Sequence, residues 1–253
     1  GELPLLEGNA GIKLHPKANL WLDGGVLGSP FTNESALSKD HLMYLRSFSA
    51  EYVPYYLQGM KLTAGLGEKS TIAVYAVNGW QQMQDQTPGM AGVVHWEYRP
   101  NARWLLNAVA FAGKEQQRLF PSNATRRLFA DFYAIYQGPK GWKATADAYL
   151  GHQAGQGYWG QANAQVQAPL AKNWSLSGRL EYFHDPNQVV TPYLQGYSGF
   201  RTASGGLTLN YKPHARALLR LETRQFLAFN DSFPTPGLGK YAQWAVAGWT
   251  VWL

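Results

Sequence analysis

Three consecutive segments within residues 142–183 alternate strictly between apolar and polar side chains. They read WKATADAYL (residues 142–150), QANAQVQA (residues 161–168) and WSLSGRLEYF (residues 174–183). A repeat of two residues predicts β-strands, because successive side chains of a strand point to opposite faces. Each of these strands therefore has one apolar and one polar face, and the fold depends on which face is inside.

The same alternation recurs along most of the chain and predicts about thirteen strands. They cover residues 10–14, 20–27, 60–66, 71–81, 92–98, 103–116, 126–136, 142–150, 161–168, 174–183, 201–211, 215–229 and 241–253. Short turns rich in Pro, Lys and Asn alternate with longer loops, which is the arrangement of an antiparallel up-and-down barrel in an outer membrane. Aromatic residues gather where strands meet the short turns, as in the girdle at a membrane interface: Tyr98, Trp104, Tyr136, Trp142, Trp174 and Tyr211.

Composition favours lipid on the outside of this wall and a polar lumen inside it. The apolar faces are rich in Ala and Gly, which fill a thick core between two sheets poorly but suffice against lipid. No stretch approaches the roughly 20 apolar residues of a membrane helix. The net charge of +6 comes from scattered basic residues, so we do not expect nucleic acid as a partner. The alternative is a soluble β-sheet protein, such as a carbohydrate-binding sandwich.

Several segments in the first third of the chain resemble the putative β-barrel porin-2 family, in the form found in Bacteroidetes-type outer membranes. The resemblance rests on NLWLDGGVL (residues 19–27), NES (33–35), RSF (46–48), AEYVPYY (50–56), GMKL (59–62) and VNGWQ (77–81). It implies an outer-membrane channel with no enzymatic role. It also implies about three further strands upstream of a segment like LPLLEGNAGIKL (residues 3–14), which would make a closed barrel of about 16 strands.

The strand count bears on the domain organisation. Bacterial barrels formed by one chain have an even number of strands. Either residues 10–14 are not a wall strand, which leaves about 12, or upstream strands are missing. We expect a single outer-membrane β-barrel domain over residues 1–253 that lacks N-terminal strands.

The polar faces define a set of candidate pore-lining residues. They are Lys61, His95, Glu97, Arg127, Asp131, Lys143, Asp147, Arg179, Glu181, Arg216, Arg220, Glu222 and Arg224. Arg216, Arg220 and Arg224 share one strand face and form a ladder of guanidinium groups. One hypothesis is a basic stripe that gives the pore a transverse field and a mild preference for anions. The other is that Arg and Glu on adjacent strands neutralise each other and stiffen the wall.

The connection formed by residues 28–57 is long enough to have a function of its own. It contains the aromatic cluster Tyr52, Tyr55 and Tyr56. Two roles remain open for it: a constriction folded into the pore, or an outward cap or subunit contact.

The remaining motifs support no enzyme, cofactor or metal site. Residues 155–160 match GxGxxG, but they open a strand instead of a helix and so cannot cradle a phosphate. An outer-membrane phospholipase needs a His–Ser pair on one strand, and no such pair occurs. We therefore predict a bacterial outer-membrane porin for passive diffusion of small polar or anionic solutes. Its partners would be outer-membrane lipid, those solutes, and further copies of itself or a larger outer-membrane assembly.

Overall fold

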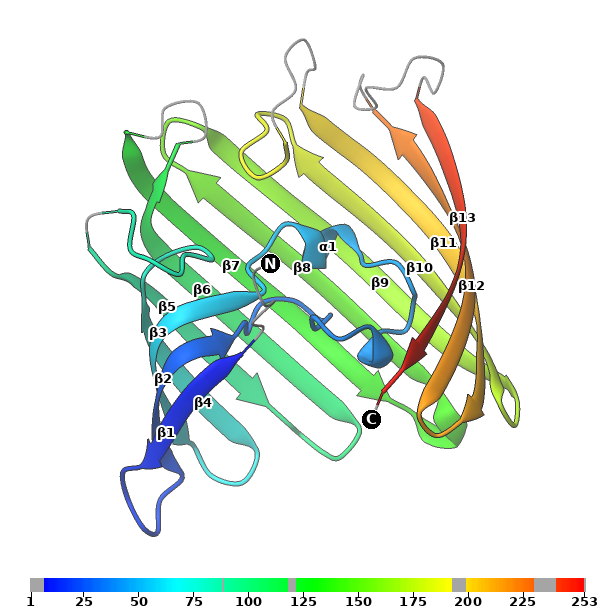
Figure 1. The fold of residues 1–253 in the computed structure, drawn as a ribbon, viewed down its shortest axis with the longest axis horizontal. Helices are drawn as coiled ribbons and strands as arrows, with labels where there is room; N and C mark the ends of the chain where they lie inside the picture. Colours follow the sequence, from blue (N-terminus) through cyan, green and yellow to red (C-terminus); the bar gives the residue numbers. More distant parts are fainter. Residues whose placement is uncertain (1–6, 88, 118–121, 193–198, 230–239, 253) are drawn as a thin grey trace.

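The computed structural model describes residues 7–87, 89–117, 122–192, 199–229 and 240–252. All thirteen predicted strands are present and form one antiparallel sheet whose order is the order of the chain (Figure 1). The strands are β1 Gly8–Lys13, β2 Leu20–Gly28, β3 Tyr56–Gly65, β4 Ser70–Val77, β5 Ala91–Tyr98, β6 Trp104–Gln116, β7 Ala124–Gln137, β8 Lys143–Gln153, β9 Gly157–Ala171, β10 Trp174–Asp185, β11 Phe200–His214, β12 Ala217–Ala228 and β13 Tyr241–Val251. Three short helices complete the elements: η1 Ser38–Asp40, α1 Phe48–Glu51 and η2 Pro139–Gly141. The all-β up-and-down prediction is confirmed.

The sheet curls into a wall that is open between its first and last strands (Figure 1). Within the described ranges, β1 pairs with β2 alone and β13 pairs with β12 alone. The register of β1 on β2 runs from Gly8 opposite Val26 to Lys13 opposite Trp21. The first segment is therefore a wall strand, and the alternative count of about 12 is wrong.

The polar face of each strand lies inside the wall and the apolar face lies outside. In β9, Gln161, Asn163 and Gln165 are buried, whereas Ala162 and Ala164 between them are exposed. Exposed leucines such as Leu180, at 73% exposure, cover the outer face. All described strands belong to one sheet, so no second sheet packs on the first and the sandwich alternative is excluded for this part of the chain. No helix among the described residues is long and apolar enough to cross a bilayer.

Aromatic pairs stand at the short-turn ends of the strands, as the girdle prediction requires. The ring centroids of Trp104 and Tyr136 are 4.7 Å apart, and those of Trp174 and Tyr211 are 4.3 Å apart. The three tryptophan side chains Trp104, Trp142 and Trp174 are between 40% and 48% exposed. Rings of this kind, apolar with one polar edge, suit the boundary between lipid and water.

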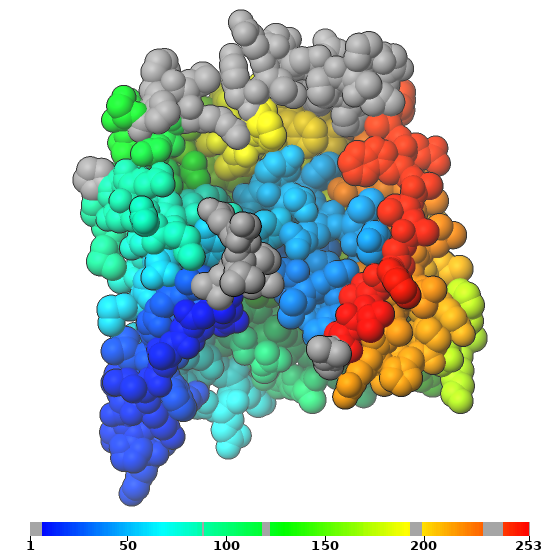
Figure 2. Space-filling view, in the orientation of Figure 1, coloured from blue at the N-terminus to red at the C-terminus, as the bar shows by residue number. Residues whose placement is uncertain are grey.

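The connection between β2 and β3, residues 29–55, folds across the concave face of the sheet; we call it the inner loop (Figure 1). It carries η1 and α1 and fills the space between the first strands and β13 in the space-filling view (Figure 2). Met43 and Ser47 near its middle are fully buried. The loop thus lies inside the wall and does not form an outward cap.

One strand boundary differs from the prediction in a way that shapes the interior. The predicted strand over residues 71–81 ends at Val77. Gly79 has φ 152°, in the region that favours glycine, and this turn lets Trp80 pack against the buried aromatic residues inside the wall.

Candidate functional site

The interior of the wall is built in three layers that follow from the strand period. Near the long loops lies an aromatic layer: Phe31, Phe48, Trp80, Phe111, Phe129, Tyr149, Trp159, Phe183 and Phe226. Below it lies an ionic belt: Arg179 and Glu181 of β10, Arg220, Glu222 and Arg224 of β12, and Glu34 of the inner loop. At the short-turn end, a cavity opens beneath the inner loop. Residues two apart on one strand share a face, so one strand contributes to several layers.

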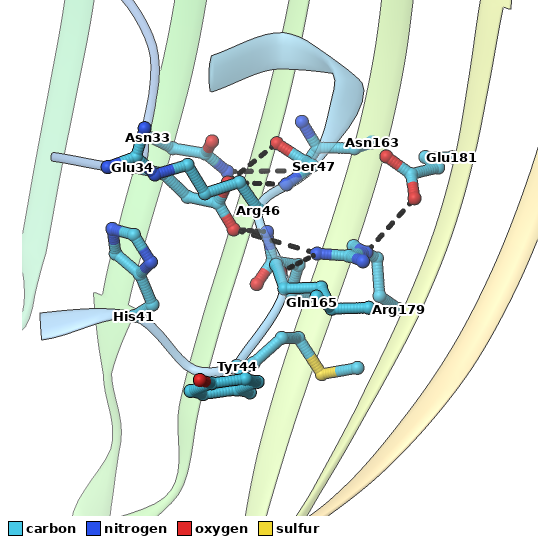
Figure 3. A network of polar contacts seen from close by, with 12 residues as sticks. Asn33, Glu34, His41, Tyr44, Arg46, Ser47, Asn163, Gln165, Arg179 and Glu181 are labelled. Atoms are coloured by element: carbon cyan, nitrogen blue, oxygen red, sulfur yellow. Dashed lines mark hydrogen bonds and ion pairs between the residues drawn. The ribbon is translucent and has the colours of Figure 1, made fainter. Parts of the chain in front are cut away.

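Arg179 is the centre of the ionic belt. Its guanidinium nitrogens lie 3.1 Å from Glu181 Oε1, 3.5 Å from Glu222 Oε1 and 3.9 Å from Glu34 Oε1. The contacts to Glu34 and Glu181 are visible in Figure 3. The side chain of Arg179 has no exposed surface. Buried charges are tolerated when they are paired and hydrogen-bonded, and the belt balances three arginines with three glutamates.

The wall carboxylates of the belt hold the inner loop by its backbone N–H groups. Glu222 Oε2 accepts hydrogen bonds from the N–H of Tyr44 at 2.7 Å and of Leu45 at 3.0 Å. Glu181 Oε2 accepts one from the N–H of Phe48 at 2.8 Å. Loop N–H groups that would otherwise be buried without partners are thereby satisfied.

The wall arginines of the belt hold the same segment by its carbonyl groups. Arg179 donates to the carbonyl of Leu45 at 2.7 Å and Arg224 to that of Arg46 at 3.0 Å. Arg220 donates to the carbonyl of Met43 at 2.8 Å. Side chains of the wall therefore bind both the N–H and the C=O groups of the loop backbone, which fixes the position of this segment.

Two aspartates on neighbouring strands anchor the beginning of the inner loop. Asp131 of β7 accepts the N–H of Thr32 at 2.9 Å, and Asp147 of β8 accepts the N–H of Asn33 at 3.0 Å. Asp147 also accepts the hydroxyl of Ser49 at 3.0 Å. Neither aspartate has a basic partner within ion-pair distance among the described residues. Asp147 also accepts a hydrogen bond from Gln161 of β9, so it links the loop to the neighbouring strand.

The tip of the loop is fitted to the last strand. The ring of Tyr44 lies against Gly248 on the inner face of β13, where a Cβ atom would overlap the ring. The same ring lies beneath the guanidinium of Arg220, 6.0 Å from its centroid. A glycine at position 248 is therefore a requirement of the docked loop.

The aromatic layer was not foreseen from the sequence. Phe31 of the inner loop stacks on Trp80 with centroids 5.3 Å apart and meets Phe129 edge-on, also at 5.3 Å. The guanidinium of Arg127 lies 5.3 Å from the ring centre of Trp80 and 5.4 Å from that of Trp159. The sequence does contain an indication of this layer: in several strands, large aromatic residues occupy positions on the face that is otherwise polar. It marks positions where the interior is filled by side chains instead of water.

The predicted lining residues fall in different places. Arg179, Glu181, Arg220, Glu222 and Arg224 form the belt, and Asp131 and Asp147 anchor the loop. Lys61 of β3 pairs with Asp23 at 3.2 Å, away from the belt. His95 contacts Asn107, and Glu97 pairs with Arg99. Arg127 joins the aromatic layer and Lys143 lines the cavity.

The prediction that Arg216 lines the pore is wrong. Arg216 lies in the exposed turn before β12, because that strand begins at Ala217 opposite His214. The N–H of Arg216 donates to His214 Nδ1 at 3.2 Å within this turn. The predicted ladder of three guanidinium groups is therefore reduced to Arg220 and Arg224 on β12.

The cavity at the short-turn end has a volume of about 610 Å³. Four lysines line it: Lys39, Lys143, Lys172 and Lys212. Its acidic residues are Glu34 and Asp40. Asp40 pairs with Lys39 at 2.7 Å, and Glu34 is bound in the belt. The remaining three lysines give the cavity a positive charge.

Comparison with known families accounts for this architecture. The model of the family described as putative beta-barrel porin-2, OmpL-like, matches residues 2–248. The chain belongs to this family. Its thirteen antiparallel strands, with exposed apolar side chains on their outer face, support the role of a porin in the outer membrane.

A solved structure, OccAB1 of Acinetobacter baumannii, is similar at 10% sequence identity with a TM-score of 0.45, over 92% of this chain and 74% of that chain. Among curated proteins, none matches the chain.

Proposed function

We propose that this porin is an outer-membrane channel for passive diffusion of small polar solutes, and that the inner loop forms its constriction. The observation that carries the proposal is the binding of the loop backbone by side chains of the inner wall. A loop held at both its N–H and C=O groups over residues 32–48 narrows the lumen in a defined position. Solutes would pass along polar surface between the loop and the wall.

The energetics favour a loop that stays docked. Hydrogen bonds that involve a charged partner contribute about 1.5–3 kcal/mol each, roughly twice as much as neutral ones. The loop receives several, from Asp131, Asp147, Glu181, Glu222 and the belt arginines. Release of the loop would also leave the buried charges of the belt without their compensating dipoles.

The sheet has two free edges, at β1 and at β13. Unpaired strand edges are not tolerated in the hydrocarbon region of a bilayer, because water is absent there to satisfy the backbone. We propose that the chain is one barrel domain whose wall is completed by further strands that pair with β1 and β13. The support is the unpaired backbone of these two strands within the described residues.

Single-channel conductance in planar bilayers tests the function. Deletion of residues 36–45 removes the tip of the inner loop, and we expect it to raise the conductance. Unchanged conductance would show that the loop does not constrict the path. A protein that stays monodisperse without detergent would contradict the membrane location itself.

A cysteine pair provides an independent control on loop position. The chain contains no cysteine, so introduced thiols have no native competitors. Asn33 Nδ2 and Thr145 Oγ1 lie 2.9 Å apart, one on the loop and one on β8. A short bifunctional thiol reagent should join the two residues of the double variant Asn33→Cys, Thr145→Cys and leave the wild-type conductance, with each single variant as the control. Failure of the reagent to join the pair would place the loop elsewhere.

A further inference from the structure

The free positive charge of the interior is not on the predicted arginine ladder. Arg220 and Arg224 are each bound to a loop carbonyl, at 2.8 and 3.0 Å, and Arg224 also pairs with Glu181. Glu222 lies between them on the same face of β12 and pairs with Arg179. Arg220 has no carboxylate within ion-pair distance among the described residues, but it is buried and also donates to the carbonyl of Ser38. Neither guanidinium therefore has much capacity left for a passing anion.

The cavity at the short-turn end, in contrast, contains lysines whose charge is not paired. Lys143 stands at the start of β8, Lys172 in the turn after β9, and Lys212 near the end of β11. None of the three has a carboxylate within ion-pair distance among the residues described. The Lys212 ammonium lies 5.7 Å from the centre of the Trp252 ring. The cavity thus presents three cations from neighbouring strand ends that no carboxylate of the wall neutralises.

The acidic groups of the cavity cannot supply that neutralisation. Glu34 Oε2 accepts both the N–H and the hydroxyl of Ser47 at 2.8 Å, and its Oε1 accepts Gln165 at 2.7 Å (Figure 3). Asp40 is bound to Lys39 through both carboxylate oxygens. The charge of Glu34 is paired with Arg179 and that of Asp40 with Lys39, so neither carboxylate compensates Lys143, Lys172 or Lys212.

The rest of the lining is suited to an organic solute. Amide and hydroxyl side chains border the cavity between the lysines, among them Gln167, Asn173, Ser175 and Asn210. Its volume of about 610 Å³ is within the range of small-molecule sites, roughly 300–1,000 Å³. Ammonium groups bind carboxylate or phosphate as point charges on flexible stems, while amides and hydroxyls bind the hydroxyl groups of the same molecule.

We propose that this cavity is a binding site for small organic anions that carry a carboxylate or phosphate group, and that it is the source of the anion preference of the channel. The inference rests on the proposed channel function and names its solute class. Because the uncompensated cations lie at one end of the pore, their field acts at one mouth and falls off within about one Debye length, roughly 8 Å at physiological salt. The channel should therefore bind anions from the short-turn side more readily than from the long-loop side.

Reversal potentials in a KCl gradient test the source of selectivity. We expect the wild type to prefer chloride, and the triple variant Lys143→Gln, Lys172→Gln, Lys212→Gln to lose at least half of its anion-to-cation permeability ratio. The matched control is Lys17→Gln, Lys69→Gln, Lys140→Gln, which makes the same change of charge in short turns at the same end without lining the cavity. Equal shifts in both triples, or a cation-selective wild type, would overturn the proposal.

Blockade by added solutes tests binding. Succinate or inorganic phosphate at millimolar concentration should reduce the chloride current from the short-turn side more than from the other side, and the cavity triple should abolish the difference. Comparison of the two probes distinguishes carboxylate from phosphate as the better ligand, and erythritol serves as the neutral probe. Symmetrical block, or block that persists in the cavity triple, would contradict the site.

The two proposals can fail separately. A protein that conducts normally but has no lysine-dependent selectivity keeps the channel function and loses the anion site. A protein that forms no channel loses the function, and the site is then tested by calorimetry of succinate binding to the detergent-solubilised protein. Binding that the cavity triple abolishes and the control triple retains would support the site, and absence of binding would overturn it.

Discussion

The aromatic layer and the ionic belt fill the same lumen through different interactions: ring packing in the first, and hydrogen bonds of charged groups in the second. In the aromatic layer, rings from six strands and the inner loop meet with centroids 4.9–6.4 Å apart, as for Trp80 and Phe129 at 4.9 Å. In the belt, each charged group is directed at a particular atom of the inner loop, as Glu222 is at the N–H of Tyr44. Ring packing tolerates small displacements, whereas hydrogen bonds with charged groups weaken steeply when their geometry changes.

The aromatic layer and the ionic belt therefore have different roles: the first stabilises the protein, and the second positions the inner loop. Burial of aromatic surface stabilises the wall and the loop together without specifying one arrangement. Buried ion pairs add little net stability compared with apolar residues of similar volume, but the loss of one partner is costly. We therefore expect changes in the aromatic layer to lower stability alone, and changes in the belt to move the loop and alter conductance as well.

The largest effect is expected for Arg179→Leu. This change leaves Glu34, Glu181 and Glu222 buried without the guanidinium that they share. The free energy of unfolding should fall by about 4 kcal/mol, and conductance should rise because the carbonyl of Leu45 loses its donor. Urea unfolding in detergent and single-channel recording measure the two quantities.

The control for this change is Arg216→Leu. Arg216 lies in an exposed turn, so the same substitution should alter stability by less than about 0.5 kcal/mol. If Arg179→Leu lowers stability but leaves conductance at the wild-type level, the belt does not position the loop. The aspartates on β7 and β8 would then be sufficient.

A smaller effect, confined to stability, is expected for Trp159→Ala. Trp159 is fully buried, and its ring covers Gly151 on the neighbouring strand, where no Cβ atom would fit. Removal of the ring should cost about 3 kcal/mol through lost burial and a residual cavity. Leu180→Ala on the lipid face is the control of similar chemistry. A change of ion selectivity in Trp159→Ala would show that the aromatic layer also governs the path of solutes.

The strands could be predicted from the sequence because the alternation that identifies a strand lies within its own residues. Alternation over five to fifteen residues located all thirteen segments, and the turn chemistry gave their antiparallel order. The inward polar face of β9 followed from the same reasoning. Arg216 was misplaced because the boundary of β12 depends on the pairing of Ala217 with His214, which a period of two does not define.

The role of the inner loop could not be predicted in the same way. Its partners are distant in sequence, as with Tyr44 and Glu222, which are separated by 178 residues. The groups that the wall recognises are also backbone N–H and C=O groups, which every residue carries. A sequence shows that arginines and glutamates face inward, but not that they hold a loop backbone instead of lining open water.

The smallest effect concerns His41, a buried residue of the inner loop whose Nε2 lies 2.6 Å from the carbonyl oxygen of Ser35. Burial lowers the pKa of His41 below its ordinary value, and the nearby guanidinium groups of Arg46 and Arg220 act in the same direction, whereas Glu34 and the Ser35 carbonyl oppose them. A docked loop therefore binds a proton less readily than a released one. As the pH falls below the ordinary histidine value of about 6.5, protonation favours the released loop, and docking is strongest above that pH.

Tryptic cleavage of the folded protein after Lys39 and Arg46 measures this release. In the wild type, we expect more cleavage at these two sites after a pulse at pH 5.5 than after a pulse at pH 7. His41→Gln, which retains a donor for the Ser35 carbonyl but does not titrate, should reduce that increase, while His15→Gln in an exposed turn should leave it unchanged. Identical pH dependence in the wild type and His41→Gln would assign the acid response to other groups, such as the aspartates that bind the start of the loop. The ionic belt would then hold the loop independently of this histidine.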